Sequence, residues 1–174
     1  MKFTKYFIFL FGCALLLLPS CLGNNDNISK DYTEWYTINQ EYIDSCELVM
    51  ENGSLAYERV VPNWDQSVFV LMRWYNDRSE TVNLLTPLSN STITVKYTLT
   101  NIAGDTLDSS SSFECQPNNM ITGFWTAVTH MHEKDTITAV IPYDAGYGSY
   151  GSGSVLPYST LIFGIRLDSI NKLF

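Results

Sequence analysis

The segment Met120–Phe163 reads M-I-T-G-F-W-T-A-V-T-H-M, then H-E-K, then D-T-I-T-A-V-I-P-Y-D, and then A-G-Y-G-S-Y-G-S-G-S-V-L-P-Y-S-T-L-I-F. Its parts predict, in order, a short helix at Gly123–Met131, a strand over residues 135–144, a glycine-rich loop and a last strand at Thr160–Phe163. The other elements of the chain are organised around this segment.

Further strands are predicted upstream of this segment. Ser67–Trp74 is rich in β-branched and aromatic residues, and Val82–Leu85 reads as a short edge strand. Thr92–Asn101 alternates with a period of two, which places four apolar side chains on one face of a strand: Ile93, Val95, Tyr97 and Leu99. A turn at 103–105 leads to another strand from Thr106 onward.

The ordered motifs of the quoted segment resemble the C-terminal half of the FKBP-type peptidyl-prolyl isomerases. In that family a Gly-aromatic pair opens a short helix, a P-D-x-A-Y-G loop follows a strand, a hydrophobic pair precedes Pro, and a T-L-x-F strand closes the sheet. The matching positions here are Gly123-Phe124, Ala145-Gly146-Tyr147-Gly148, Val155-Leu156-Pro157 and Thr160-Leu161-Ile162-Phe163.

A second part of the resemblance lies upstream, where the family has V-x-Y-T-G and then F-D-S-S. The equivalents are Val95–Leu99 and Leu107–Ser110, with Leu99 in place of Gly and Leu107 in place of Phe. The resemblance spans about Ser67–Asp168, so the isomerase-like domain is predicted at 67–174. It implies an α+β fold, in which a strongly twisted antiparallel sheet wraps around the short helix, and an extra helix precedes it.

The resemblance also implies a set of site residues. Phe124 would form the floor of a proline pocket where Trp is usual, Tyr147 would donate a hydrogen bond to the substrate carbonyl, and Asp108 would lie on the side of the carbonyl carbon. The substrate-binding positions that it implies are Tyr97, Leu107, Phe113, Met120, Ile121, Val155, Leu156 and Phe163.

The sequence contains no other catalytic or cofactor-binding motif whose neighbouring residues fit the structure that the motif requires. Gly146–Gly151 fits the letters G-x-G-x-x-G, but Pro142 precedes it and Pro157 follows, so no helix can begin there as a dinucleotide site requires. No Lys-Ser/Thr follows for a phosphate loop, and no G-x-S-x-G elbow is present. His130 and His132 are two apart and point to different sides of a helix. We therefore expect no cofactor and no metal.

The stretch 29–66 is predicted to be an N-terminal helical extension. A helix should run from Ser29, which can cap it, to about Met50, with Asn52-Gly53 as its stop. Its apolar stripe consists of Trp35, Ile38, Tyr42, Cys46, Val49 and Met50. This stripe either packs on the domain's own sheet or serves as a dimerisation or client-holding arm, as in some exported members of the isomerase family.

Residues 1–20 are predicted to be a signal peptide. Lys2 and Lys5 precede an apolar run, Tyr6–Leu18, that is shorter than the ~20 residues of a membrane span. The following Leu-Pro-Ser-Cys21 resembles a bacterial lipobox, in which Cys21 is acylated. The alternatives are a secretory signal cut elsewhere and an uncleaved anchor. Residues 21–28 would form a polar tether, and the expected location is the cell envelope, on the periplasmic side of the outer membrane.

Charge excludes some partners. The chain has a formal net charge of −8, and removal of the signal peptide leaves eight basic and eighteen acidic residues. A mature protein with this excess of acidic residues is repelled by phosphate backbones, so nucleic-acid binding is not expected. The same charge opposes docking on anionic lipid, so a covalent lipid would have to provide the anchor.

Two cysteines remain once Cys13 in the signal peptide and Cys21 are set aside. Cys46 and Cys115 are far apart in sequence. An exported protein could oxidise them to a disulfide, or they could remain two buried thiols.

Three functions fit these observations. The first is cis/trans isomerisation of X-Pro bonds in exported polypeptides, which needs no nucleophile, metal or cofactor. The second is a client-binding or chaperone module with weak turnover, because Leu107 and Phe124 both reduce the ring area that the family places in its pocket. The third is an envelope lipoprotein whose domain acts as a scaffold. The sequence does not indicate an oligomeric state or a client.

Overall fold

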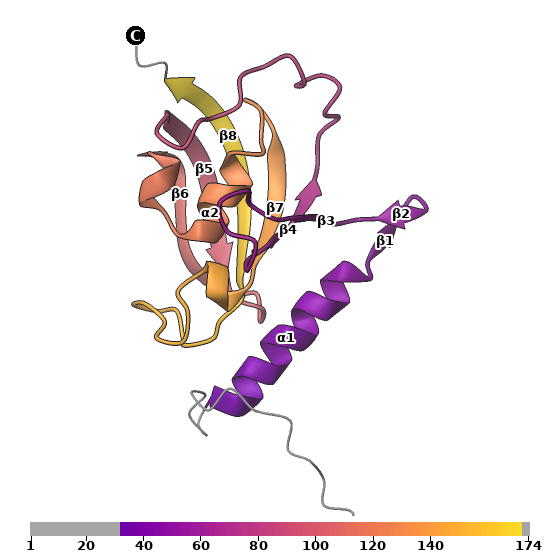
Figure 1. Ribbon diagram of the computed structural model, residues 1–174, viewed down its shortest axis with the longest axis vertical. Coiled ribbons are helices and arrows are strands. Elements are labelled where there is room, and N and C mark those ends of the chain that lie inside the picture. Colours follow the sequence, from indigo (N-terminus) through magenta and orange to yellow (C-terminus); the bar gives the residue numbers. More distant parts are fainter. Residues whose placement is uncertain (1–31, 172–174) are drawn as a thin grey trace, which may run out of the picture.

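The computed structural model describes residues 32–171, so the predicted signal peptide, the tether, Cys21 and the Ser29 cap lie outside the described residues. Two α-helices and a large antiparallel sheet make up this part, which confirms the predicted α+β class (Figure 1). In order, the elements are α1 (Thr33–Glu47), β1 (Met50–Glu51), β2 (Ser54–Leu55), β3 (Glu58–Val60), β4 (Val70–Trp74), β5 (Thr92–Thr100), β6 (Thr106–Cys115), η2 (Pro117–Asn119), α2 (Thr122–Val128), β7 (Thr136–Ile141), η3 (Tyr143–Ala145) and β8 (Leu161–Asn171).

The main sheet has six strands in the order β3-β4-β7-β8-β5-β6, and every pair is antiparallel. The last strand, β8, lies inside the sheet and pairs with both β5 and β7. The two halves of the sheet are therefore joined only through the C-terminal strand. The predicted face of β5 is confirmed, since Ile93, Val95 and Leu99 are buried.

Helix α2 packs on the inner face of the sheet and builds the main core. Phe124, Ala127 and Val128 pack there with strand residues such as Met72 and Ile165. Gly123 allows the close approach, because a Cβ at this position would lie 2.2 Å from Cγ2 of Ile141. The helix ends at Val128, earlier than the predicted Met131.

Helix α1 covers part of the opposite face. Ile43 and Cys46 pack against Leu71 and Val140, which alternate along β4 and β7 with the residues of the main core. The alternative that the helix packs on its own sheet is therefore the one observed. The predicted stripe was only partly right, because Asn39 and Ile43 are buried while Ile38, Val49 and Met50 are exposed.

Two other predictions of local structure were wrong. The helix ends at Glu47, and Asn52-Gly53 instead forms the two-residue turn between β1 and β2, with φ angles of 51° and 84°. Such positive angles suit a tight hairpin turn, for which Asn-Gly is the preferred pair. Residues 82–85 do not form a strand: Val82 and Asn83 lie in turns, and the amide of Leu84 donates a hydrogen bond to the carbonyl of Thr81.

The predicted boundary between residues 66 and 67 stays a prediction, but several contacts cross it. Strand β3 pairs with β4, and Val60 lies in the main core. The rings of Trp64 and Trp125 stack at 4.2 Å.

Cys46 and Cys115 are both free thiols. No helix within residues 32–171 is long and apolar enough to cross a membrane.

The side chain of Asn39 links α1 to the start of β8 by a hydrogen bond, and truncation of this side chain should destabilise the fold. The side chain is fully buried; Oδ1 accepts a bond from the amide of Thr160 at 2.7 Å, and Nδ2 donates to the carbonyl of Trp35 at 2.8 Å. Asn39→Ala leaves the Thr160 amide buried without that partner, so we expect a loss of about 1–3 kcal/mol in the free energy of unfolding. Urea denaturation measures the change.

The exposed Glu41 of the same helix provides the matched control. Glu41→Ala should alter the free energy of unfolding by no more than about 0.5 kcal/mol. Equal stability of the Asn39→Ala and Glu41→Ala proteins would show that α1 is not held by this contact.

Candidate active site

Two phenylalanines form the deepest part of the candidate site. Phe124 is on the first turn of α2 with 1% of its surface exposed, and Phe163 is on the central strand β8 with 5% exposed. Their rings meet edge to face with centroids 5.5 Å apart. Because the helix approaches the sheet closely at Gly123, the ring that follows it is directed onto the strands rather than into solvent.

Tyr97 extends this cluster from β5. Its ring lies edge to face with Phe113 at 5.5 Å and is tilted against Phe163 at 5.9 Å. Its hydroxyl donates a 2.6 Å hydrogen bond to Oδ2 of Asp108. The other carboxylate oxygen of Asp108 accepts the amide of Ser109 at 2.8 Å. The carboxylate and the phenol are thus held together at the edge of the aromatic cluster.

Burial above all, together with the hydrogen bond to Asp108 and the nearby negative charge of that carboxylate, raises the pKa of Tyr97 to about 12. A raised pKa favours the protonated form, so the hydroxyl remains a donor to Asp108 until the solution is strongly alkaline. The site therefore keeps one protonation state of this tyrosine throughout the physiological range.

Aliphatic side chains complete the surroundings of the rings. Leu107, Met120 and Ile121 are partly buried against the main core, to which Val155 also belongs. Leu156 is 49% exposed and lies at the outer edge. These residues come from β6, from the turn before α2 and from the loop before β8.

The glycine-rich loop is held in a defined conformation. Gly151 has a φ of +69°, and a Cβ there would lie 2.3 Å from the carbonyl oxygen of Val155, so this position requires glycine. A bridge between Ser152 and Val155 closes the loop tip. Tyr147 is 37% exposed on this loop.

The structure thus brings Tyr97, Asp108, Phe113, Phe124 and Phe163 into one connected group. Tyr147 and Leu156 are both exposed. The roles of these residues in binding and catalysis stay predictions. Sequence reasoning missed the contribution of α1, whose Trp35 donates a hydrogen bond to Ser159 in the loop before β8. No sequence motif marks this contact, because the two residues are 124 positions apart.

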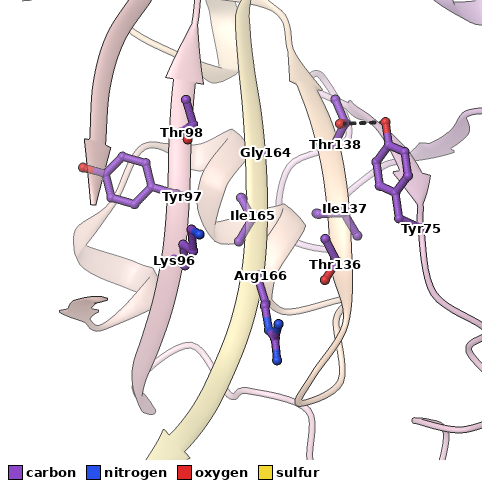
Figure 2. A pocket seen from close by; sticks show the side chains of 10 residues that line it. All are labelled: Tyr75, Lys96, Tyr97, Thr98, Thr136, Ile137, Thr138, Gly164, Ile165 and Arg166. Carbon is purple, nitrogen blue, oxygen red and sulfur yellow. Dashed lines mark hydrogen bonds between the residues drawn. The ribbon is translucent and has the colours of Figure 1, made fainter. Parts of the chain in front are cut away.

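A hollow lies on the outer face of the sheet, around Gly164 (Figure 2). Its volume is about 330 Å³, and Lys96, Arg166, Thr136 and Thr138 are among the residues that line it. In Figure 2 the ring of Tyr97 extends toward the edge of the sheet and away from Gly164. Tyr97 lines this hollow as well, whereas Phe113, Phe124 and Phe163 do not.

The buried carboxylate of Asp135 lies outside the candidate site and is fully engaged. It accepts bonds from Thr81 at 2.6 Å, from Asn76 at 2.9 Å and from the amide of His132 at 2.8 Å. Burial raises its pKa, but these bonds and the nearby Arg78 outweigh burial, so the net pKa lies below the ordinary value. Its contacts join two loops, which indicates a structural role. No cluster that could hold a metal exists within residues 32–171.

Residues 85–168 match the family model described as FKBP-type peptidyl-prolyl cis-trans isomerase. The chain is also 43% identical over 56 residues to a macrophage infectivity potentiator of Trypanosoma cruzi, and the match covers 32% of this chain and 29% of that protein. These matches support an FKBP-type peptidyl-prolyl cis-trans isomerase family for residues 85–168. The chain spans less than a third of the length of the curated relative that it matches.

Solved structures agree on the fold. A peptidyl-prolyl cis-trans isomerase from Pseudomonas syringae has a TM-score of 0.68 and 19% identity, over 81% of this chain and 96% of that one. FkpA from Escherichia coli has a TM-score of 0.68 and 20% identity, over 82% of this chain and 62% of that one. At these identities the likeness concerns the fold alone, and it confirms the predicted architecture.

The contact between Tyr97 and Asp108 makes a testable prediction about the tyrosine's pKa. In Asp108→Asn the negative charge is removed while burial remains, so the pKa of Tyr97 should fall from about 12 toward the ordinary value of about 10. NMR of ¹³C-labelled tyrosine measures the titration, with the Tyr97 signal identified by its loss in Tyr97→Phe. Asp105→Asn is the control, because Asp105 bonds to Asn101 instead. An unchanged Tyr97 titration in Asp108→Asn would contradict this geometry.

Proposed function

We propose that this chain catalyses cis/trans isomerisation of X-Pro bonds in polypeptides, with the aromatic cluster around Phe124 as the proline site. The observation that supports this most strongly is the arrangement of Tyr97, Phe113, Phe124 and Phe163 as one group of ring contacts with Asp108 bonded at its edge. The match of residues 85–168 to the isomerase family model gives the second support.

The reaction requires a particular kind of stabilisation. The barrier is about 18–20 kcal/mol and arises from the lost resonance of the amide, and proline narrows the gap between cis and trans without removing the barrier. The twisted amide is less polar along its C–N bond than the planar one. An apolar surface that binds proline better in the twisted state therefore accelerates the reaction by differential binding, about tenfold for each 1.36 kcal/mol.

Individual residues have distinct tasks in this proposal. Phe124 is the floor beneath the proline ring, while Ile121, Val155, Leu156, Tyr97 and Phe163 form the walls. Tyr147 donates a hydrogen bond to the substrate carbonyl. Asp108 lies on the side of the carbonyl carbon and, through the bond from Tyr97, fixes the orientation of that ring. None of these tasks requires a group that titrates near neutral pH.

Tyr147→Phe should lower kcat/KM by up to about tenfold, the worth of one hydrogen bond of about 0.5–1.5 kcal/mol. The matched control is Tyr150→Phe, which removes the same hydroxyl from the same loop at a position that is 91% exposed. A protease-coupled assay of the full chain, purified in detergent, measures both. Equal losses in the two variants would contradict the role of Tyr147.

The rate of isomerisation should be nearly independent of pH between about 6 and 8. The raised pKa of Tyr97 keeps its hydroxyl protonated across this window, and the mechanism uses no histidine. A pH profile of kcat/KM from the same assay measures this. A change of an order of magnitude across the window would show that an ionisable group takes part in the reaction.

A second candidate function is a client-binding module with little turnover. Leu107 and Phe124 support it, because each is smaller than the aromatic residue that the family resemblance leads one to expect. Folded protein that binds proline-containing peptides without isomerising them would favour this function.

We further propose that the protein is exported and held in the cell envelope by a lipid on Cys21, on the periplasmic side of the outer membrane. The support is the Leu18–Cys21 box behind an apolar run and the polar residues that follow it. Its clients would then be exported polypeptides. Since the body is acidic, the lipid provides the attachment without help from basic residues.

Cys21→Ser should abolish incorporation of a labelled fatty acid and move the protein from the membrane fraction to the soluble fraction. The reason is that the thiol is the acylated group in this proposal. Metabolic labelling and fractionation of both forms measure the change, and Cys13→Ser is the control. Equal labelling of the Cys21→Ser and wild-type proteins would contradict the proposal.

A further inference from the structure

A second cavity adjoins the candidate proline site. It has a volume of about 300 Å³ and lies where α1, the turn between β5 and β6, and the loop before β8 meet. Two of its lining residues, Leu107 and Leu156, also belong to the predicted proline site. The full lining is Trp35, Asn101, Asp105, Leu107, Ser154, Leu156 and Ser159.

Helix α1 forms one wall of this cavity and is firmly attached there. The indole Nε1 of Trp35 donates to Oγ of Ser159 at 3.1 Å. One turn further along the helix, Asn39 accepts the amide of Thr160 at 2.7 Å. The ring of Tyr36 lies edge to face with Tyr143 at 5.7 Å. Since the one polar hydrogen of Trp35 is already used, its remaining surface is an aromatic ring.

The opposite wall carries negative charge. Asp105 is exposed, and its carboxylate accepts a bond from Nδ2 of Asn101 at 3.0 Å. Asn101 is itself committed, because its Oδ1 accepts the amides of Ala103 and Asp105. No ion pair within residues 32–171 includes Asp105. The cavity thus combines an aromatic ring with a carboxylate that no basic residue of the described chain neutralises.

We propose that this cavity is a second substrate subsite that takes a basic side chain, lysine or arginine, from a residue adjacent to the proline. The proposal rests on the proposed isomerase function. An ammonium or guanidinium group is attracted both by an aromatic face and by a carboxylate. Adjacent residues of an extended peptide are about 3.3–3.6 Å apart. Because Leu107 and Leu156 line the cavity and also belong to the predicted proline site, the residue next to the bound proline would reach it.

The test is a panel of short peptides with arginine, leucine or glutamate immediately before or immediately after a single proline. Exchange NMR measures kcat/KM with the full chain in detergent, and fluorescence anisotropy of labelled peptides measures binding. At one of the two positions, arginine should raise kcat/KM about three- to tenfold over leucine, and glutamate should lower it. High salt should reduce the difference.

Three variants test which residues cause the preference for arginine. Asp105→Asn should remove most of the preference for arginine while leaving the leucine peptide within about twofold, and Trp35→Leu should weaken the preference in the same direction. Asp44→Asn makes the same change of charge at an exposed position of α1 and should leave the preference intact. Equal kcat/KM for arginine, leucine and glutamate at both positions, or a preference that survives Asp105→Asn, overturns the subsite.

The two proposals fail in different ways. Turnover without any preference for arginine would leave the isomerase function standing and reject the subsite. Binding of arginine peptides that depends on Asp105, without turnover, would reject the isomerase function and support the subsite. Absence of both turnover and binding contradicts both.

Discussion

The close contact between α2 and β7 at Gly123 is the constraint on which the site depends. Any side chain at this position would collide with the fully buried side chain of Ile141. Because the helix lies so near the sheet, Phe124 reaches Phe163 on the central strand. The same contact that completes the hydrophobic core therefore also builds the deepest part of the aromatic cluster, so stability and site geometry share one cause.

The shape of β6 decides the rest of the cluster. Asp108 and Phe113 are five residues apart, and in a regular strand an odd spacing places two side chains on opposite faces. Here Val95 is opposite Phe113 while Tyr97 is opposite Ser110, so β6 contains one residue more than β5 over this interval. This bulge turns both Asp108 and Phe113 toward Tyr97, as the hydrogen bond and the ring contact show.

Helix α1 joins structural support to the neighbourhood of the site. Its C-terminal half covers Leu71 and Val140 on the outer face of the sheet. Its N-terminal half holds the loop before β8 through Trp35, Tyr36 and Asn39. That loop carries Val155 and Leu156, so the helix influences the site through the loop while packing on the face opposite α2. An extension outside the family motifs thus becomes part of the same folded unit.

The sequence by itself determined the fold class, the short helix beginning near Gly123, the inward face of β5 and the identity of the clustered aromatic residues. The helix and the face of β5 follow from local periodicity, whereas the fold class and the aromatic residues follow from the resemblance of ordered motifs to a known family. The structure confirms the elements. The sequence did not determine the end of α1, because Asn-Gly can stop a helix as well as turn a hairpin, and only the pairing of β1 with β2 selects the turn.

Tertiary structure alone decided how distant residues meet. The bulge in β6 depends on pairing with β5, which no single-strand pattern encodes. The burial of Asn39 depends on its bond to Thr160, 121 residues away. The cavity between Trp35 and Asp105 exists only because α1 packs beside the turn after β5. Periodicity reports which face of an element is apolar, but the partner of that face is fixed by long-range packing, which the local sequence does not contain.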